Sequence, residues 1–110
     1  GQCTWWAATR RADIGKPIPG WGNAATWAGS AASAGYTVDG SPSAGSVIVF
    51  QPGVLGASAD YGHVAMVEEV RGDGSILISE SNALGLGVVS TREISASQLA
   101  AAGNGVRYIH

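Results

Sequence analysis

Hydrophobic residues at the start of the chain recur at the spacing of a helix. In the segment 2–14, Cys3, Trp6 and Ala7 fall on one face at i, i+3 and i+4 positions, and Gly15 follows as a stop signal. This pattern predicts a helix over the segment. Cys3 would then lie in the first turn of that helix.

A second, shorter helix is predicted in the stretch that follows. Asn23 is a suitable N-cap, an Ala-rich run carrying Trp27 comes next, and Gly35 closes the stretch. The small residues of this run suit close packing against a neighbour. We therefore expect the first third of the chain to be helical.

After Gly35 the pattern changes to short runs of β-favouring residues separated by Gly, Pro, Asp and Ser. Strands are predicted at residues 36–38, 47–50, 64–70, 76–80, 88–94 and 106–109. Ser95 and Gln98 have the spacing of a capping box, which predicts a single helical turn between the last two strands. Helices followed by strands indicate an α+β fold with an antiparallel sheet of about six strands.

Composition narrows the class of protein. The 110 residues form one domain, 1–110, and the chain lacks an apolar run of the roughly 20 residues that a membrane-spanning helix needs. The formal charge is −2 and the six Lys and Arg residues are scattered, so there is no basic stripe for nucleic acid. We expect neither a membrane nor a nucleic acid as partner.

The single cysteine excludes an internal disulfide. Cys3 is therefore either a packing residue, the commoner fate of an isolated cysteine, or a working thiol. A helix N-terminus and a nearby histidine both favour the thiolate, and Cys3 has the first of these. Only two residues precede Cys3, without a signal peptide, so we expect a domain excised from a longer protein.

A predicted hairpin supplies the histidine. His63 opens one strand, and a two-residue turn within 72–74 would put it on the same face as Glu80 and Asn82. With Gly72-Asp73 as the turn, His63 lies opposite Asn82 and diagonal to Glu80. A turn of odd length would reverse the face and leave Glu80 as a solvated strand end. A carboxylate on the core side of a sheet needs a hydrogen-bond partner, and the imidazole of His63, which it would orient, would be that partner.

The other histidine, His110, ends the chain, and we expect it to be frayed or merely solvent-facing. The sequence shows no metal-ligand spacing such as HExxH or paired CxxC, no GxSxG elbow and no P-loop. Asp60 and Asp73 are interpreted as turn residues.

Several motifs taken together resemble one family. They are GQCTWWA at the start, Asn23-Ala24 with Trp27, PSAGSVIV from Pro42 to Val49, YGHVA at 61–65 followed by Val67-Glu68, and ISESN ending at Asn82. In this order they resemble the CHAP family, the cysteine, histidine-dependent amidohydrolases/peptidases. The resemblance spans nearly the whole chain. It implies a papain-like fold in which N-terminal helices pack on an antiparallel, barrel-like sheet.

The resemblance also implies the roles of individual residues. Cys3 would be the nucleophile, His63 the general base and then acid, and Glu80 the residue that orients His63, with Asn82 assisting. The backbone N–H of Cys3 and the side chain of Gln2 are candidates for the oxyanion hole.

Aromatic residues are candidates for contacts to substrate. We expect Tyr61, two residues before His63, and Trp5 to line a groove, whereas Trp6 and Trp27 are predicted to be core residues. Some calcium-binding relatives carry an acidic loop ahead of the nucleophile, but only Gly1 and Gln2 stand there in this sequence. We expect no metal and no cofactor.

The family suggests a peptidoglycan hydrolase, either an endopeptidase on stem or cross-bridge peptides or an N-acetylmuramoyl-L-alanine amidase. We expect it to act outside the cell on the wall, as a secreted bacterial or phage-encoded monomer. Two other functions stay open at this point. One is a catalytically silent wall-binding or structural module of a phage tail or secretion assembly, and the other is an amidase on a soluble small molecule.

Overall fold

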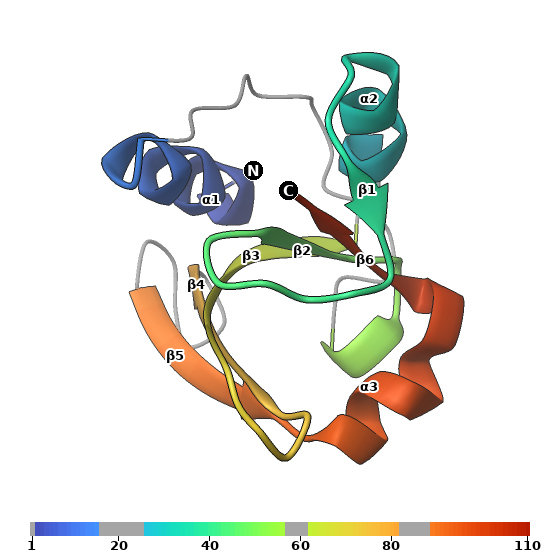
Figure 1. Cartoon of the computed structure of the whole chain (residues 1–110). Helices are drawn as coiled ribbons and strands as arrows, with labels where there is room; N and C mark the ends of the chain where they lie inside the picture. The colour runs from blue at the N-terminus through green and yellow to red at the C-terminus, as the bar shows by residue number, and fades with distance from the viewer. Residues whose placement is uncertain (1, 16–25, 57–61, 82–88) are drawn as a thin grey trace.

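Three helices and six strands make up the described part of the chain, residues 2–15, 26–56, 62–81 and 89–110 of a computed structural model (Figure 1). The helices are α1 (Gln2–Asp13), α2 (Trp27–Ser33) and α3 (Ala96–Ala102). The strands are β1 (Val38–Asp39), β2 (Val47–Phe50), β3 (His63–Val70), β4 (Ile76–Ser81), β5 (Val89–Ile94) and β6 (Val106–Ile109), and two short 3₁₀ turns are η2 (Val54–Gly56) and η3 (Gly103–Gly105).

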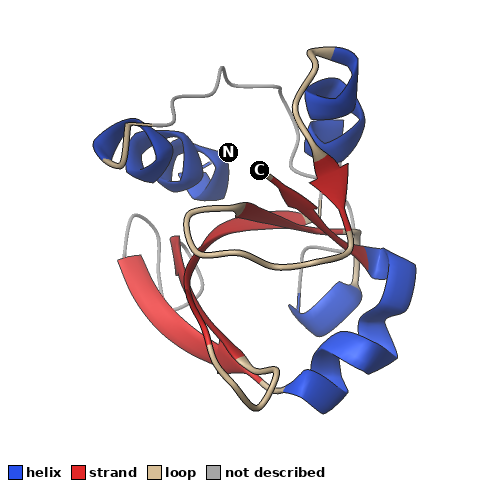
Figure 2. Cartoon of the chain, viewed as in Figure 1, coloured by secondary structure: helices blue, strands red, loops and turns tan. Residues whose placement is uncertain are grey.

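The strands form one antiparallel sheet in the order β1-β6-β2-β3-β4-β5, with β1 and β5 at its edges. The sheet is strongly curved (Figure 2). Helices α1 and α2 lie on one side and α3 on the other. The predicted α+β class and the number of strands are confirmed.

Helix α1 follows the sequence prediction closely. It ends at Asp13, and Gly15 adopts a positive φ of 76°, which a glycine reaches without steric cost. Helix α2 begins at Trp27 with Thr26 as its N-cap, later than the predicted start, and Asn23 lies outside the described residues. The helix ends at Ser33 with Ala34 as its C-cap, and Gly35, the predicted stop signal, follows with a φ of 94°.

The turn predicted before the last strand is longer than expected. Ser95 Oγ accepts from the backbone N–H of Gln98 at 3.2 Å, and the Gln98 side chain accepts from Ser95 N at 2.9 Å, so the capping box is present. The helix then continues over the Ala-rich segment to Ala102. Alanine has the highest helix propensity, which accounts for the extension.

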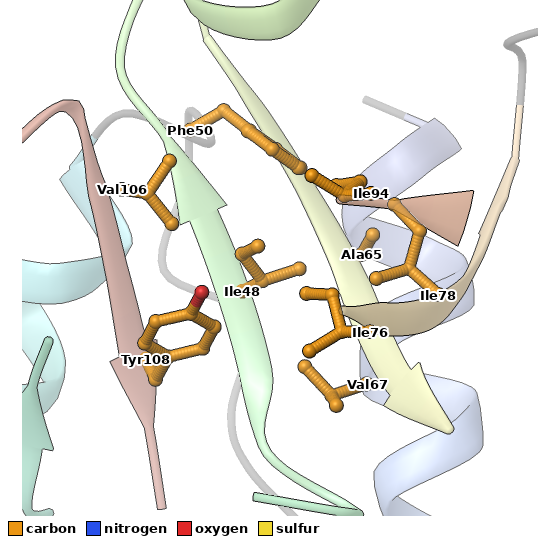
Figure 3. Close-up of a cluster of buried hydrophobic side chains, with 9 residues drawn as sticks. All are labelled: Ile48, Phe50, Ala65, Val67, Ile76, Ile78, Ile94, Val106 and Tyr108. Carbon is orange, nitrogen blue, oxygen red and sulfur yellow. The ribbon is translucent and has the colours of Figure 1, made fainter. Parts of the chain in front are cut away.

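The core has two parts, one on each face of the sheet. On the α1 and α2 face, Ala7, Trp27 and Ala31 pack against residues of the sheet. On the opposite face the buried cluster consists of Ile48, Phe50, Ala65, Val67, Ile76, Ile78, Ile94, Val106 and Tyr108 (Figure 3). Because both faces are covered, the central strand β2 is buried at every position.

Two tryptophans were predicted to be core residues. Trp27 is fully buried, as expected. Trp6 is only partly buried, and its indole Nε1 donates a hydrogen bond to Ser79 Oγ at 3.0 Å. The prediction is therefore right for Trp27 and incomplete for Trp6, which also contributes a hydrogen bond through its indole N–H.

Candidate active site

His63 and Glu80 come together at one end of the β2-β3-β4 region. His63 begins β3 directly opposite Phe50, the last residue of β2. The side chain of Glu80 continues the inward-facing series that Ile76 and Ile78 begin in β4. A carboxylate therefore ends an otherwise apolar row, as the alternation along this strand predicted.

The turn between β3 and β4 differs from the prediction. Arg71 N donates to Ser75 O at 2.9 Å, so three residues, 72–74, form the turn rather than two. A turn of odd length would by itself put His63 on the wrong face, but a β-bulge between Val67 and Glu69 reverses the face again. The predicted two-residue turn is wrong.

The register beyond the bulge is nevertheless the predicted one. Met66 pairs with Ser79 and Val67 with Ile78, which continues to put Ala65 opposite Glu80. His63 is then diagonal to Glu80 on the same face. Asn82, the predicted partner opposite His63, lies outside the described residues.

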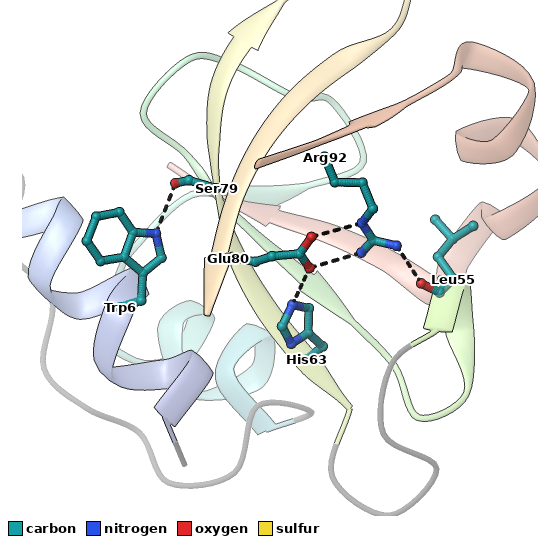
Figure 4. A network of polar contacts seen from close by, with 6 residues as sticks. All are labelled: Trp6, Leu55, His63, Ser79, Glu80 and Arg92. Carbon is teal, nitrogen blue, oxygen red and sulfur yellow. Dashed lines mark hydrogen bonds and ion pairs between the residues drawn. The ribbon is translucent and has the colours of Figure 1, made fainter. Parts of the chain in front are cut away.

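The imidazole and the carboxylate are joined by a hydrogen bond, with 2.9 Å between His63 Nε2 and Glu80 Oε1 (Figure 4). Because a carboxylate only accepts, Nε2 carries the proton. The His63 ring also stacks on Phe50, with 5.5 Å between ring centroids. Glu80 is 2% exposed and His63 14%, so the pair is largely shielded from water.

Arg92 is a third member of this cluster. Its Nε lies 3.0 Å from Glu80 Oε2 and its Nη2 lies 3.2 Å from Glu80 Oε1. Burial works to raise the pKa of Glu80, but the hydrogen bond from His63 and the charge of Arg92 outweigh it. The pKa of Glu80 therefore lies below its ordinary value, and the group is a carboxylate at neutral pH.

The sequence interpretation missed Arg92. The sequence did indicate that a buried Glu80 needs a hydrogen-bond partner. It could not identify Arg92 as that partner, because seven residues, 82–88, separate β4 from β5, and a connection of that length does not determine how the two strands pair. In the structure, Arg92 pairs with Ile78 across the two strands, diagonal to Glu80.

Helix α1 is tied to the same hairpin on the other face of the sheet. Glu68, at the bulge, accepts hydrogen bonds from Arg10 Nε at 3.1 Å, Arg10 Nη2 at 2.9 Å and Ser79 Oγ at 2.6 Å. Ser79 in turn accepts from Trp6. The bonds from Arg10 hold the pKa of Glu68 below its ordinary value, against the effect of burial.

These contacts tie to the sheet the helix that has the predicted nucleophile in its first turn. The backbones of Gln2, Cys3 and Trp5 lie in the first turn of α1. Tyr61, the predicted groove residue, lies outside the described residues, as does Asp60.

His110 does not behave as predicted. Its Nε2 lies 2.7 Å from Asp39 Oδ1, its Nδ1 lies 2.8 Å from Ser43 Oγ, and its backbone N–H donates to Thr37 O at 2.9 Å. The expectation of a frayed or merely solvent-facing residue is wrong, because β1 and the residues on either side of it provide three hydrogen-bond partners. Asp73, by contrast, is a turn residue as predicted, since its Oδ1 accepts from Ser75 N at 2.9 Å.

Within residues 2–15, 26–56, 62–81 and 89–110, no three His, Cys, Asp or Glu side chains gather in a group that could hold a metal ion. The helices of this same part of the chain include none that is both long enough and apolar enough to cross a membrane.

Comparison with known proteins gives consistent similarities. The model of the family described as CHAP domain matches residues 1–82. A probable autolysin, SsaALP, of Staphylococcus aureus is 54% identical over 83 residues, which are 74% of this chain and 29% of the relative. The staphylococcal secretory antigen ssaA2 of the same species is 46% identical over 111 residues, 100% of this chain and 37% of the relative.

A solved structure is similar over the full chain. The crystal structure of an N-acetylmuramoyl-L-alanine amidase from Staphylococcus aureus superimposes with a TM-score of 0.92 at 42% identity, covering 100% of this chain and 30% of that one. The chain thus spans little more than a third, or less, of these relatives' lengths.

Proposed function

The chain belongs to the CHAP domain family, and on that premise we propose that it is a cysteine-dependent peptidoglycan hydrolase, which cleaves an amide bond of the bacterial cell wall. Relatives named as an autolysin and as an N-acetylmuramoyl-L-alanine amidase domain protein support this substrate. The observation that carries the proposal is the buried His63–Glu80 pair at 2.9 Å, in a fold whose first helix has the one cysteine in its first turn.

In this proposal Cys3 is the nucleophile. Its backbone lies in the first turn of α1, at the positive end of the helix dipole, and a cysteine at such a position favours the thiolate. Because Glu80 binds Nε2 of His63, Nδ1 is the ring nitrogen that exchanges a proton with the thiol. Glu80 orients the ring and stabilises the imidazolium that forms.

The reaction then has two halves. The thiolate attacks the amide carbonyl and forms a C–S bond, and the resulting oxyanion takes hydrogen bonds from the Cys3 N–H and the Gln2 side chain. The C–N bond breaks as His63 gives its proton to the leaving amine. Water, deprotonated by His63, next attacks the thioester, which releases the carboxylic acid and restores the thiol.

The site of action and the finer substrate are part of the same proposal. Relatives named as a secretory antigen and an autolysin support action outside the cell, on the wall. Asn82 would assist Glu80, and Tyr61 and Trp5 would contact the substrate peptide. Both the muramoyl-alanine bond and the peptide bonds of stem and cross-bridge are amides, so this mechanism serves either.

Zymography on purified cell walls tests the proposal. Wild-type protein is expected to clear the walls, whereas Cys3→Ala and His63→Ala are expected to keep the fold and lose clearing. His110→Ala removes the other histidine, which is bound to Asp39 away from Glu80, and is the matched control that should still clear. Mass spectrometry of fragments from a defined muropeptide would then name the bond.

Three outcomes would overturn the proposal. Clearing by both wild type and Cys3→Ala would exclude the cysteine mechanism, and clearing by neither would favour a silent wall-binding module. Turnover of a soluble amide without wall clearing would exclude the wall as the substrate.

A further inference from the structure

The carboxylate of Glu80 is shared between two partners. Oε1 lies 2.9 Å from His63 Nε2 and 3.2 Å from Arg92 Nη2, while Oε2 lies 3.0 Å from Arg92 Nε. Figure 4 shows the guanidinium and the imidazole approaching the carboxylate from β5 and β3. Arg92 therefore donates to the same carboxylate oxygen, Oε1, that accepts the hydrogen bond from His63 Nε2.

The guanidinium is itself held in place by other groups. Its Nη1 donates to Leu55 O at 2.9 Å, and its central carbon lies 5.6 Å from the centre of the Phe50 ring. Phe50 is also the ring on which His63 stacks. Arg92 and His63 thus share both a carboxylate and an aromatic neighbour.

The backbone is strained at Leu55, the residue whose carbonyl accepts the hydrogen bond from Arg92. Leu55 has φ 51° and ψ 39°, the left-handed region, and among the described residues it is the one non-glycine residue with a positive φ. Such a conformation is unfavourable for a residue other than glycine and persists where surrounding contacts impose it. The hydrogen bond from Arg92 to its carbonyl is one such contact.

Charge explains why the carboxylate needs this partner. Glu80 is 2% exposed, and burial by itself raises the pKa of a carboxyl group, so its charged form depends on its partners. Within the described part of the chain, His63 from β3 and Arg92 from β5 are the groups whose interactions lower the pKa of Glu80. Helix α1, which packs on β3 and β4, directs Arg10 to Glu68 and Arg11 to backbone carbonyl groups.

Resting on the proposed function, we propose that Arg92 is a positioning residue of this site. It holds the Glu80 carboxylate charged, and in the orientation in which that carboxylate accepts the Nε2–H of His63. Arg92 acts through Glu80 and does not touch the scissile bond. A fixed salt bridge behind the orienting carboxylate would keep the His63 ring aligned through both halves of the reaction.

The test compares Arg92→Met and Arg92→Lys with wild type in the same chain. The initial rate of wall clearing is measured against pH at low substrate concentration. In Arg92→Met the acidic limb of the profile is expected to move up by about 1–3 pH units, the effect of removing an opposite charge beside a carboxylate. Arg92→Lys keeps the charge but loses the two-pronged geometry, so a smaller move is expected.

Two further variants separate positioning from general damage. Arg71→Met removes a surface arginine paired with Glu69 and Glu93, so it makes the same change in net charge and should leave the profile unchanged. In a Glu80→Gln background, Arg92→Met should no longer move the acidic limb, because the group it acts on is absent.

A readout independent of activity completes the experiment. The ¹³C signal of the Glu80 carboxyl is followed by NMR during a pH titration, and its midpoint should rise in Arg92→Met in parallel with the acidic limb. Unchanged midpoints and profiles in both Arg92 variants would overturn the inference. Arg92→Lys decides the question where Arg92→Met fails to fold. Absence of clearing by wild type would instead overturn the proposed function, while the NMR midpoint still decides the Arg92–Glu80 relation.

Discussion

Glu80 is the residue on which the contacts of the candidate site converge, since it receives hydrogen bonds from His63 and Arg92. Replacing Glu80 by Gln keeps a similar shape and one acceptor, but removes the negative charge that stabilises the imidazolium. We expect Glu80→Gln to lower the rate of wall clearing by less than His63→Ala, because an orienting role is less costly to lose than the base itself. Initial clearing rates of the two variants at pH 7 check this.

The two variants need circular dichroism as a control, because a misfolded protein would also be inactive. An equal loss of rate in well-folded Glu80→Gln and His63→Ala would contradict an orienting role for Glu80. It would indicate that the carboxylate itself takes part in proton transfer.

Physical reasons explain which residues of the site could be predicted from the sequence and which could not. Glu80 was predictable, because alternation along a strand places it on the face of Ile76 and Ile78. Arg92 was not, because its position depends on how β5 pairs with β4 after a long connection. His110 was misjudged because its partners, Asp39 and Ser43, are distant in sequence.

At the scale of elements, side-chain hydrogen bonds link α1 to the β3-β4 hairpin. Ser79 is the centre of this link, since it accepts from Trp6 and donates to Glu68. Ser79→Ala removes the hydroxyl that accepts from the Trp6 indole N–H and donates to Glu68 Oε2, an oxygen that also accepts from Arg10 Nε. Losing these two hydrogen bonds is expected to cost about 1–3 kcal/mol.

The expected result for Ser79→Ala is a fall in Tm of about 4–8 °C for each kcal/mol lost in a domain of this size. Thermal unfolding followed by circular dichroism measures it. Ser33→Ala, at an exposed position near the end of α2, is the matched control and should change Tm little. An unchanged Tm in Ser79→Ala would show that apolar packing alone fixes α1.

Elements were predicted more reliably than the details that join them. The periodicities of the sequence indicated α1 and the strands, because each element buries one face or both. The start of α2, the length of α3 and the β3-β4 turn were not predicted correctly. Caps and bulges depend on single hydrogen bonds that a hydrophobic pattern does not record.

At the scale of the whole molecule, stability should depend on pH in a defined way. The folded state lowers the pKa of Glu68 and Glu80 below 4.5, so their contribution is complete above that value and is lost as pH falls through the folded values. Burial raises the pKa of Tyr108 from 10.0 to about 12, so its contribution is complete below pH 10.0 and is lost as pH rises towards 12.

We therefore expect the free energy of unfolding to be level between about pH 5 and pH 10 with respect to these groups, and to fall on both sides. Urea unfolding at a series of pH values measures this. Tyr108→Phe keeps the ring without the hydroxyl and should flatten the alkaline side, whereas an unchanged alkaline fall would assign it to other groups.

The three-residue turn at 72–74 and the bulge next to Glu68 have opposite effects on the direction in which the side chains of β3 point. Only together do they bring His63 and Glu80 to one face. An insertion or deletion of one residue in a surface turn is ordinarily harmless, but here it would turn the histidine away from its carboxylate. Changes of length in this hairpin are therefore tolerated in pairs, one in the turn and one at the bulge.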